Sequence, residues 1–204
     1  MKILVACEFS GVVRDAFLKK GHDAVSCDLL PSESNHPEDS WRHIQGDVLR
    51  EFKSHHWDLM VAHPPCTYLA ICGNRSFKNN PHRWKKRYQA MVFVYDLMNA
   101  NIEKICIENP KSVISSYVRK PDQCIQPYEF GHPERKTICL WLKNLPLLKP
   151  TKIVEPKDII YNSKKTKSGK SRYSNLWNGS YSGKERSVTF RGIAEAMASQ
   201  WGDS

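Results

Sequence analysis

The sequence has 204 residues, 40% hydrophobic and 25% charged, with a net charge of +10, which is ordinary for a globular domain apart from the basic excess. No apolar run approaches the about 20 residues of a membrane-spanning helix, and the run after Lys2 is too short for a secretion signal. We therefore expect one cytoplasmic domain, residues 1–204, with no membrane partner.

Strands and helices are expected to alternate from the N-terminus. Short apolar runs predict strands at 2–7, 23–28, 43–48, 57–63 and 103–109. A first helix follows Ser10, a candidate N-cap, and ends near Gly21. A second helix is expected at about 83–100. Its apolar stripe is expected to face the core, and the stripe comprises Trp84, Tyr88, Met91, Val92, Tyr95 and Met98.

The second half continues with weaker patterns. A short helix is expected within 112–119, and strands are expected at 125–130 and 137–142. The segment 151–187 is polar and basic, so we expect a flexible loop or an insertion that a ligand orders. A final helix at 191–201 has four apolar residues on one side: Ile193, Ala194, Met197 and Trp201. The alternation predicts an α/β fold, a doubly wound Rossmann-like sheet with helices on both faces.

The positive charge is concentrated in two segments. Residues 75–87 hold six Lys or Arg and no acid, and residues 151–190 hold nine with three acids. Aromatic residues lie among these cations in both segments. Cations that meet phosphates, with aromatic rings on which bases stack, favour a nucleic-acid partner over a merely solvated surface.

Seven cysteines remain to be explained. No C-x-x-C pair and no zinc-like Cys/His spacing occurs, so we expect reduced thiols and no metal. Four lie in strand-like runs and are expected to be buried: Cys7, Cys27, Cys106 and Cys139. The candidates for chemistry are Cys66, Cys72 and Cys124, and Cys72 is expected to be structural.

In a doubly wound sheet, ligands bind beyond the carboxyl ends of the strands. Acidic residues end the second, third and fifth strands, as expected for a nucleoside-containing cofactor, although each could merely cap a helix. After the fourth strand, Pro64 and Pro65 fix the backbone and hold Cys66 partly exposed, beside cations that favour a thiolate. Glu108 ends the neighbouring fifth strand and should face the same pocket. His63 is expected to cap its strand.

These motifs, in this order, resemble those of the DNA (cytosine-5-)-methyltransferases, in a compact form such as bacteriophages carry. The matching stretches are "EFSG", "SCD", "GDV", "HPPCTYL" and "IENP", over about residues 3–110. The segment "FGHPERKTICLWL" resembles the later family motif G-x-P-Q-x-R-x-R, and residues 185–201 resemble the closing segment. The chain departs at Thr67, where the family has glutamine, and has no room for a large target-recognition domain.

The resemblance implies S-adenosylmethionine as methyl donor and DNA as partner. Phe9 would stack on the adenine, Gly11 would let the backbone approach, Asp28 would bind the ribose and Asp47 the adenine amino group. The full set of implied cofactor residues is Phe9, Ser10, Gly11, Asp28, Asp47, Pro65 and Leu69. Cys66 would be the nucleophile that adds to C6 of cytosine, Glu108 would hold the base, and Arg135 would match the first arginine of the later motif.

Phosphate contacts are expected from cations of the two basic segments. They are Arg75, Lys78, Arg83, Lys85, Lys164, Lys165, Arg172 and Arg186. A phage-encoded protein would act in the host cytoplasm. Two other functions stay open: a pyrimidine-modifying transferase that acts on a free nucleotide or uses a modified donor, and a non-catalytic nucleic-acid- or nucleotide-binding protein.

Overall fold

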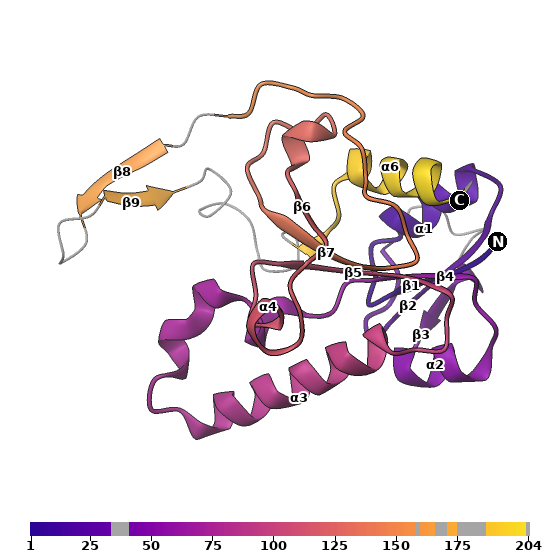
Figure 1. Ribbon diagram of the computed structural model, residues 1–204, viewed down its shortest axis with the longest axis horizontal. Helices are drawn as coiled ribbons and strands as arrows, with labels where there is room; N and C mark the ends of the chain where they lie inside the picture. The colour runs from indigo at the N-terminus through magenta and orange to yellow at the C-terminus, as the bar shows by residue number, and fades with distance from the viewer. Residues whose placement is uncertain (34–40, 158–159, 166–170, 175–186, 203–204) are drawn as a thin grey trace.

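The computed structural model describes residues 1–33, 41–157, 160–165, 171–174 and 187–202 (Figure 1). Seven strands form one sheet in the order β3-β2-β1-β4-β5-β7-β6. They are β1 (Lys2–Ala6), β2 (Asp23–Asp28), β3 (His43–Gln45), β4 (Leu59–Ala62), β5 (Lys104–Pro110), β6 (Gln123–Ile125) and β7 (Ile138–Lys143). The first five pair in parallel, and β7 runs antiparallel to β5 and β6. This confirms the predicted doubly wound, Rossmann-like α/β sheet.

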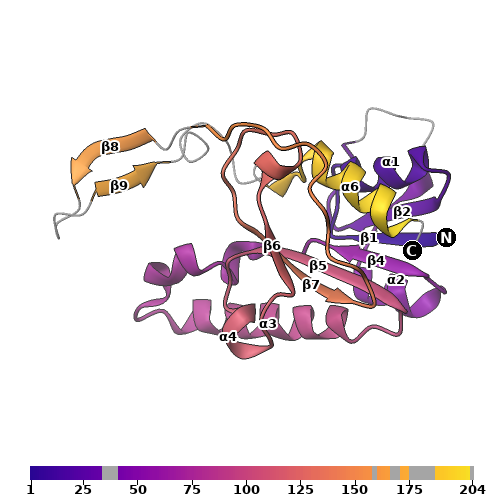
Figure 2. The same ribbon diagram turned by 45° about the horizontal axis from the view of Figure 1, so that its top comes forward.

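Helices cover both faces of the sheet (Figures 1 and 2). Helices α1 (Val12–Lys19) and α6 (Arg191–Trp201) lie on one face, and α2 (Val48–Ser54), α3 (Pro81–Met98) and α4 (Ile114–Tyr117) lie on the other. The central strands are mostly apolar because both of their faces are buried, as in Leu59–Ala62. Each face has its own hydrophobic cluster, so the sheet is held from two sides.

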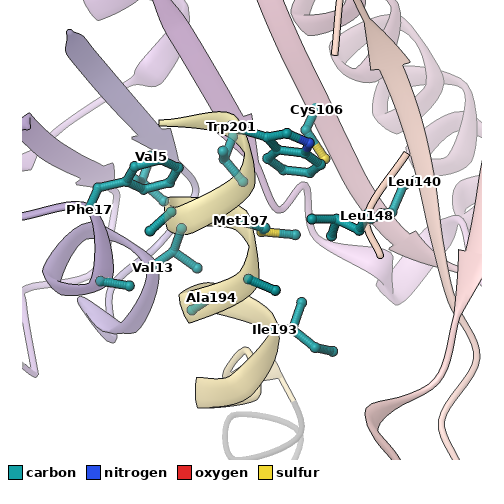
Figure 3. Close-up of a cluster of buried hydrophobic side chains, with 14 of the residues drawn as sticks. Val5, Val13, Phe17, Cys106, Leu140, Leu148, Ile193, Ala194, Met197 and Trp201 are labelled. Carbon is teal, nitrogen blue, oxygen red and sulfur yellow. The ribbon is translucent and has the colours of Figure 1, made fainter. Parts of the chain in front are cut away.

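The last helix packs as its apolar side predicts. Figure 3 shows side chains of α6, among them Met197 and Trp201, pointing into the cluster that also holds Val5 and Phe17. The indole Nε1 of Trp201 donates to the carbonyl oxygen of Pro146 at 2.9 Å, so the polar atom of this buried ring is satisfied. The two ends of the chain thus share one core.

The side of helix α3 that packs against the core is not the side that was predicted. Its buried residues are Arg87, Val94 and Leu97, whereas Trp84 and Tyr88 are 49% and 67% exposed. Only the methionines of the predicted stripe pack against the core. The reason is Arg87, whose guanidinium lies 3.5 Å from the centre of the Phe77 ring and draws that side of the helix inward. The prediction that this aromatic stripe is core was wrong.

Three local predictions also need correction. The strand expected at 125–130 is instead β6 followed by a 3-10 turn, Pro127–Glu129, because Pro127 offers no ladder donor and the Glu129 carboxylate accepts from the amide of Gln126. Helix α2 was not predicted. Part of the segment 151–187 forms a hairpin, β8 (Ile160–Lys165) and β9 (Ser171–Ser174). Within the described residues, no helix is long and apolar enough to cross a membrane.

Candidate active site

The carboxyl ends of β1, β2, β4 and β5 lie along one edge of the sheet because these strands are parallel neighbours. These strand ends and the loops after them, with the loop after β3, carry the predicted catalytic and cofactor-binding residues apart from Arg135. This edge has two halves. We call the loops after β1, β2 and β3 the first half and the loops after β4 and β5, with the segment 131–137, the second half.

In the first half, the chain turns sharply after β1. Cys7 has a φ of +59° and Gly11 a φ of +75°, both in the left-handed region, and only glycine adopts it without steric cost. The carboxylate of Glu8 accepts from the amides of Val13 at 2.7 Å and Arg14 at 3.2 Å. Glu8 therefore caps α1, the role predicted for Ser10, whose hydroxyl lies 3.4 Å from the amide of Val12.

Two carboxylates flank this turn. One oxygen of Asp28 accepts from the amide of Leu30 at 2.9 Å, and one oxygen of Asp47 accepts from the amide of Leu49 at 3.0 Å and caps α2. Burial, followed by the charges of Asp28, Cys27 and Asp47, raises the pKa of the Cys7 thiol. The charges of both carboxylates thus reach the Cys7 thiol beside β1. The second oxygen of each carboxylate has no hydrogen-bond partner among the described residues.

The remaining residues predicted to bind the cofactor lie in different environments. Phe9 is 7% exposed, and its carbonyl oxygen accepts from the amide of Glu33 at 2.8 Å. Pro65 is exposed. Leu69 is fully buried in the core beneath the sheet, and its amide donates to the carbonyl oxygen of Cys66. The side chain of Leu69 is therefore a packing residue, which corrects its predicted cofactor role.

In the second half, Cys66 is exposed at the start of a 3-10 turn. Two side chains hold its loop from either side. Asn109 at the end of β5 is buried, and its Nδ2 donates to the carbonyl oxygen of Pro64 at 2.8 Å. Arg87 of α3 donates through Nε to the carbonyl oxygen of Tyr68 at 2.7 Å. The loop is thus fixed immediately before and after the thiol.

Glu108 lies in β5, beside the strand that leads to Cys66. Its Oε2 lies 3.2 Å from Nδ1 of His63, which follows β4. Burial alone would raise the pKa of Glu108, but the hydrogen bond and charge of His63, together with Lys136, outweigh burial and lower it. His63 is therefore a partner of the predicted base-holding carboxylate rather than a strand cap.

The cation next to this pair is Lys136 and not Arg135. Arg135 is exposed, and its Nε donates to the carbonyl oxygen of Lys157 at 3.1 Å. Lys136 acts on both Cys66 and Glu108 by its charge. Counting from Gly131 through the motif G-x-P-Q-x-R also places Lys136 at the first arginine, so the assignment to Arg135 was one residue out of register.

The thiol of Cys66 is not strongly activated in the protein alone. The residue is exposed, but nearby protein atoms partly withdraw its sulfur from water, and this desolvation, followed by the charge of Glu108, raises the pKa of the thiol, while Lys136 opposes the rise. The basic segments that follow in sequence do not offset the rise, contrary to the sequence-based expectation. Cys66 is thus a thiol held in a fixed loop, and its raised pKa disfavours the thiolate at neutral pH.

The predicted phosphate contacts belong to two parts of the structure. Arg75, Lys78 and Lys85 are exposed around the start of α3, while Arg83 is half-buried 5.0 Å from the centre of the Tyr68 ring. Lys164 and Lys165 lie on β8 and Arg172 on β9. Arg186 lies outside the described residues. The exposed rings of Trp84 and Tyr88 accompany the first part.

Neither a protein-family model nor a curated protein matches this chain. Among solved structures, the fold is similar to that of a protein from E. coli encoded within a prophage and described as a proposed DNA modification methyltransferase. The two sequences are 15% identical, and the TM-score is 0.47. The alignment covers 76% of this chain and 52% of the other, so this chain spans about half the length of that protein. A likeness of this degree does not identify an activity.

Proposed function

We propose that the protein is an S-adenosylmethionine-dependent methyltransferase that modifies C5 of cytosine in DNA through a covalent Cys66 adduct. One observation carries the proposal: an exposed Cys66 in a loop fixed by Asn109, with Glu108 on the adjacent strand. A thiol and a carboxyl group at neighbouring strand ends can engage C6 and N3 of one pyrimidine ring.

The residue types fit the chemistry of cytosine. C5 is a poor nucleophile until a thiolate adds to C6, and negative charge then develops toward N3. Glu108 offsets that charge when it donates a proton or a hydrogen bond to N3. Lys136 favours the thiolate of Cys66 over the thiol. When the proton leaves C5, the C6–sulfur bond breaks and the thiolate of Cys66 is restored.

The first half of the site suits the cofactor. The unpartnered oxygens of Asp28 and Asp47 can accept from hydroxyl and amino groups of an adenosine, and the left-handed turn at Gly11 leaves no side chain in the way. S-adenosylmethionine supplies an electrophilic methyl group when it is bound. Asp28 and Asp47 would orient it, and the loop of residues 8–11 would flank it.

DNA is the substrate that the basic surfaces favour. Figures 1 and 2 place the β8–β9 hairpin and the start of α3 toward the same end of the molecule. Both segments carry Lys and Arg residues that can contact phosphates on either side of a target base. Turning that base out of a duplex costs a few kcal/mol, which such contacts can offset.

The test is trapping with DNA that contains 5-fluorocytosine. Fluorine cannot leave C5 as a proton does, so a protein–DNA adduct persists in the presence of S-adenosylmethionine. We expect an adduct with the wild-type protein and none with Cys66→Ser, while Cys72→Ser serves as the matched control. Free 5-fluorocytidine nucleotides form a parallel arm, and an adduct there alone would replace DNA by a nucleotide as substrate. No adduct in either arm, despite measured cofactor binding, would refute the proposal.

A further inference from the structure

His63 lies between two carboxylates, the buried Glu8 and the partly buried Glu108. Strand β4 is the neighbour of both β1 and β5, so the residue after β4 is flanked by the loop after β1 and by the end of β5. The amide of His63 donates to the carbonyl oxygen of Ala6 at 2.9 Å. Glu108 lies on one side at 3.2 Å from Nδ1, and the charge of His63 also acts on Glu8 on the other side.

The imidazole is enclosed. Its side chain is 7% exposed, and its Nε2 is buried with no hydrogen-bond partner among the described residues. Glu8 is 4% exposed and is already bound to the amides at the start of α1. A residue that only ends a strand needs neither a buried ring nor two neighbouring carboxylates. The backbone amide of His63 is already bonded to Ala6. The burial of an ionisable ring between two acids calls for another explanation.

The charged groups around His63 come from every neighbouring element. Glu8 follows β1, with Arg14 of α1 behind it, and Glu108 comes from β5, with Lys136 behind it. The charge of Glu108 also acts on the Cys66 thiol. The hydrogen bond between Nδ1 of His63 and Oε2 of Glu108 joins two groups that can each carry a proton. The pair of His63 and Glu108 can therefore hold a single proton in either of two places.

We propose that His63 is a positioning residue that keeps a proton shared with Glu108, so that Glu108 can donate to the target base. This inference rests on the proposed cytosine chemistry. As an ionised carboxylate, Glu108 has no proton to offer N3. When the proton moves from Nδ1 to Glu108, an N–H bond breaks and an O–H bond forms. The total charge of the pair is unchanged, so no co-reactant is required.

The direction of the pH effect follows. While the pair holds its proton, Glu108 can donate, and it loses this ability when the pair loses the proton at alkaline pH. In His63→Asn, the Asn Nδ2 can replace Nδ1 as hydrogen-bond donor but cannot give up its proton. Glu108 alone must then be protonated, so adduct formation falls off at a lower pH than in the wild type.

The experiment measures the rate of 5-fluorocytosine adduct formation against pH for wild type, His63→Asn and the exposed-site control His56→Asn. We expect His63→Asn to be about 100-fold slower at about pH 8 and closer to wild type in acid, the size expected for a lost proton donor. A wild-type pH profile in His63→Asn would show a structural role only and overturn the inference. Thermal melting checks that the variants are folded.

A second measurement separates this inference from the proposed function. The carboxyl carbon of Glu108 is followed by NMR during a pH titration of the protein without substrate. Loss of the His63 charge should move protonation of Glu108 to higher pH in His63→Asn. An unmoved titration of Glu108 overturns the inference whether or not an adduct forms. If the wild-type protein forms no adduct but the titration of Glu108 still shifts in His63→Asn, the cytosine chemistry is contradicted and the proton-sharing pair stands.

Discussion

In the first half of the strand-end edge, each acid is bound to backbone amides nearby, whereas in the second half the polar side chains hold one another and the loop of Cys66. Asp28 and Asp47 each accept from an amide two residues ahead. Glu108 contacts His63, and Asn109 reaches across to Pro64. We therefore expect substitutions in the first half to have independent effects, and substitutions in the second half to have coupled effects.

The largest effect is expected from Glu108→Gln, which tests that coupling directly. Adduct formation should fall by about 10²–10⁴-fold because the donor to N3 is lost. Alkylation of Cys66 by iodoacetamide should become faster at neutral pH, since removal of the negative charge lowers the pKa of the thiol. Lys136→Met should slow alkylation for the opposite reason.

These rates should be followed from about pH 6 to 10 in a protein with Cys72 and Cys124 replaced by serine. In the wild-type background, the rate should still rise above pH 9.0, the ordinary midpoint of a thiol, because the pKa of Cys66 is raised. Equal alkylation rates in Glu108→Gln and its parent would show that the two residues do not interact.

Asn109→Ala should come next, with adduct formation reduced by about 100-fold, because a nucleophile that is slightly misplaced loses about this much rate. The variant also leaves the carbonyl oxygen of Pro64 without its donor, which costs about 1–3 kcal/mol of unfolding free energy. Urea unfolding and adduct kinetics measure the two effects.

The matched control for Asn109→Ala is Asn99→Ala, which removes an exposed amide that bonds the carbonyl oxygen of Tyr95. Binding of S-adenosylmethionine should stay unchanged in both variants. If Asn109→Ala weakened cofactor binding as much as it slowed the adduct, the two halves of the site would not be separable.

Asp28→Asn should weaken S-adenosylmethionine binding by about tenfold, the value of one hydrogen bond to a charged group. Alkylation of Cys66 should not change, because Asp28 belongs to the first half. Asp23→Asn, at the other end of β2 and paired with Arg42, is the control. Calorimetric titration provides the affinities. A changed alkylation rate in Asp28→Asn would contradict the independence of the first half.

The smallest effect is expected from Trp84→Ala, on the exposed face of α3. Loss of one ring that stacks on a base should weaken DNA binding by about fivefold, with stability nearly unchanged because the side chain is half exposed. Trp41→Ala removes another exposed indole, next to β3, and should not affect affinity. Fluorescence anisotropy with labelled DNA compares them, and equal affinities would exclude α3 as a base-stacking surface.

Several features were predictable because they depend on local sequence. Apolar runs marked the central strands, and two prolines marked the end of β4. The adjacency of Cys66 and Glu108 followed from parallel strand order. Their roles stay predictions until the adduct is tested.

Other features depend on contacts between distant segments. The periodicity of α3 grouped Trp84 with Tyr88 on one side but could not show that Arg87 would draw the adjacent side inward. The proposed role of His63 depends on Glu8 and Glu108, which lie on either side of it in space but are distant from it in the sequence. Lys136 could have been found from the sequence by counting the motif from Gly131.

The shared core of α1 and α6 sets an order of events during synthesis. Trp201 and Met197 fill the cluster around Val5 and Phe17, so the core on the α1 face of the sheet stays incomplete until residues 191–201 have left the ribosome. The strands that carry Cys66 and Glu108 are made much earlier. The core that supports them is therefore completed late, and we expect the site to become stable only when α6 docks.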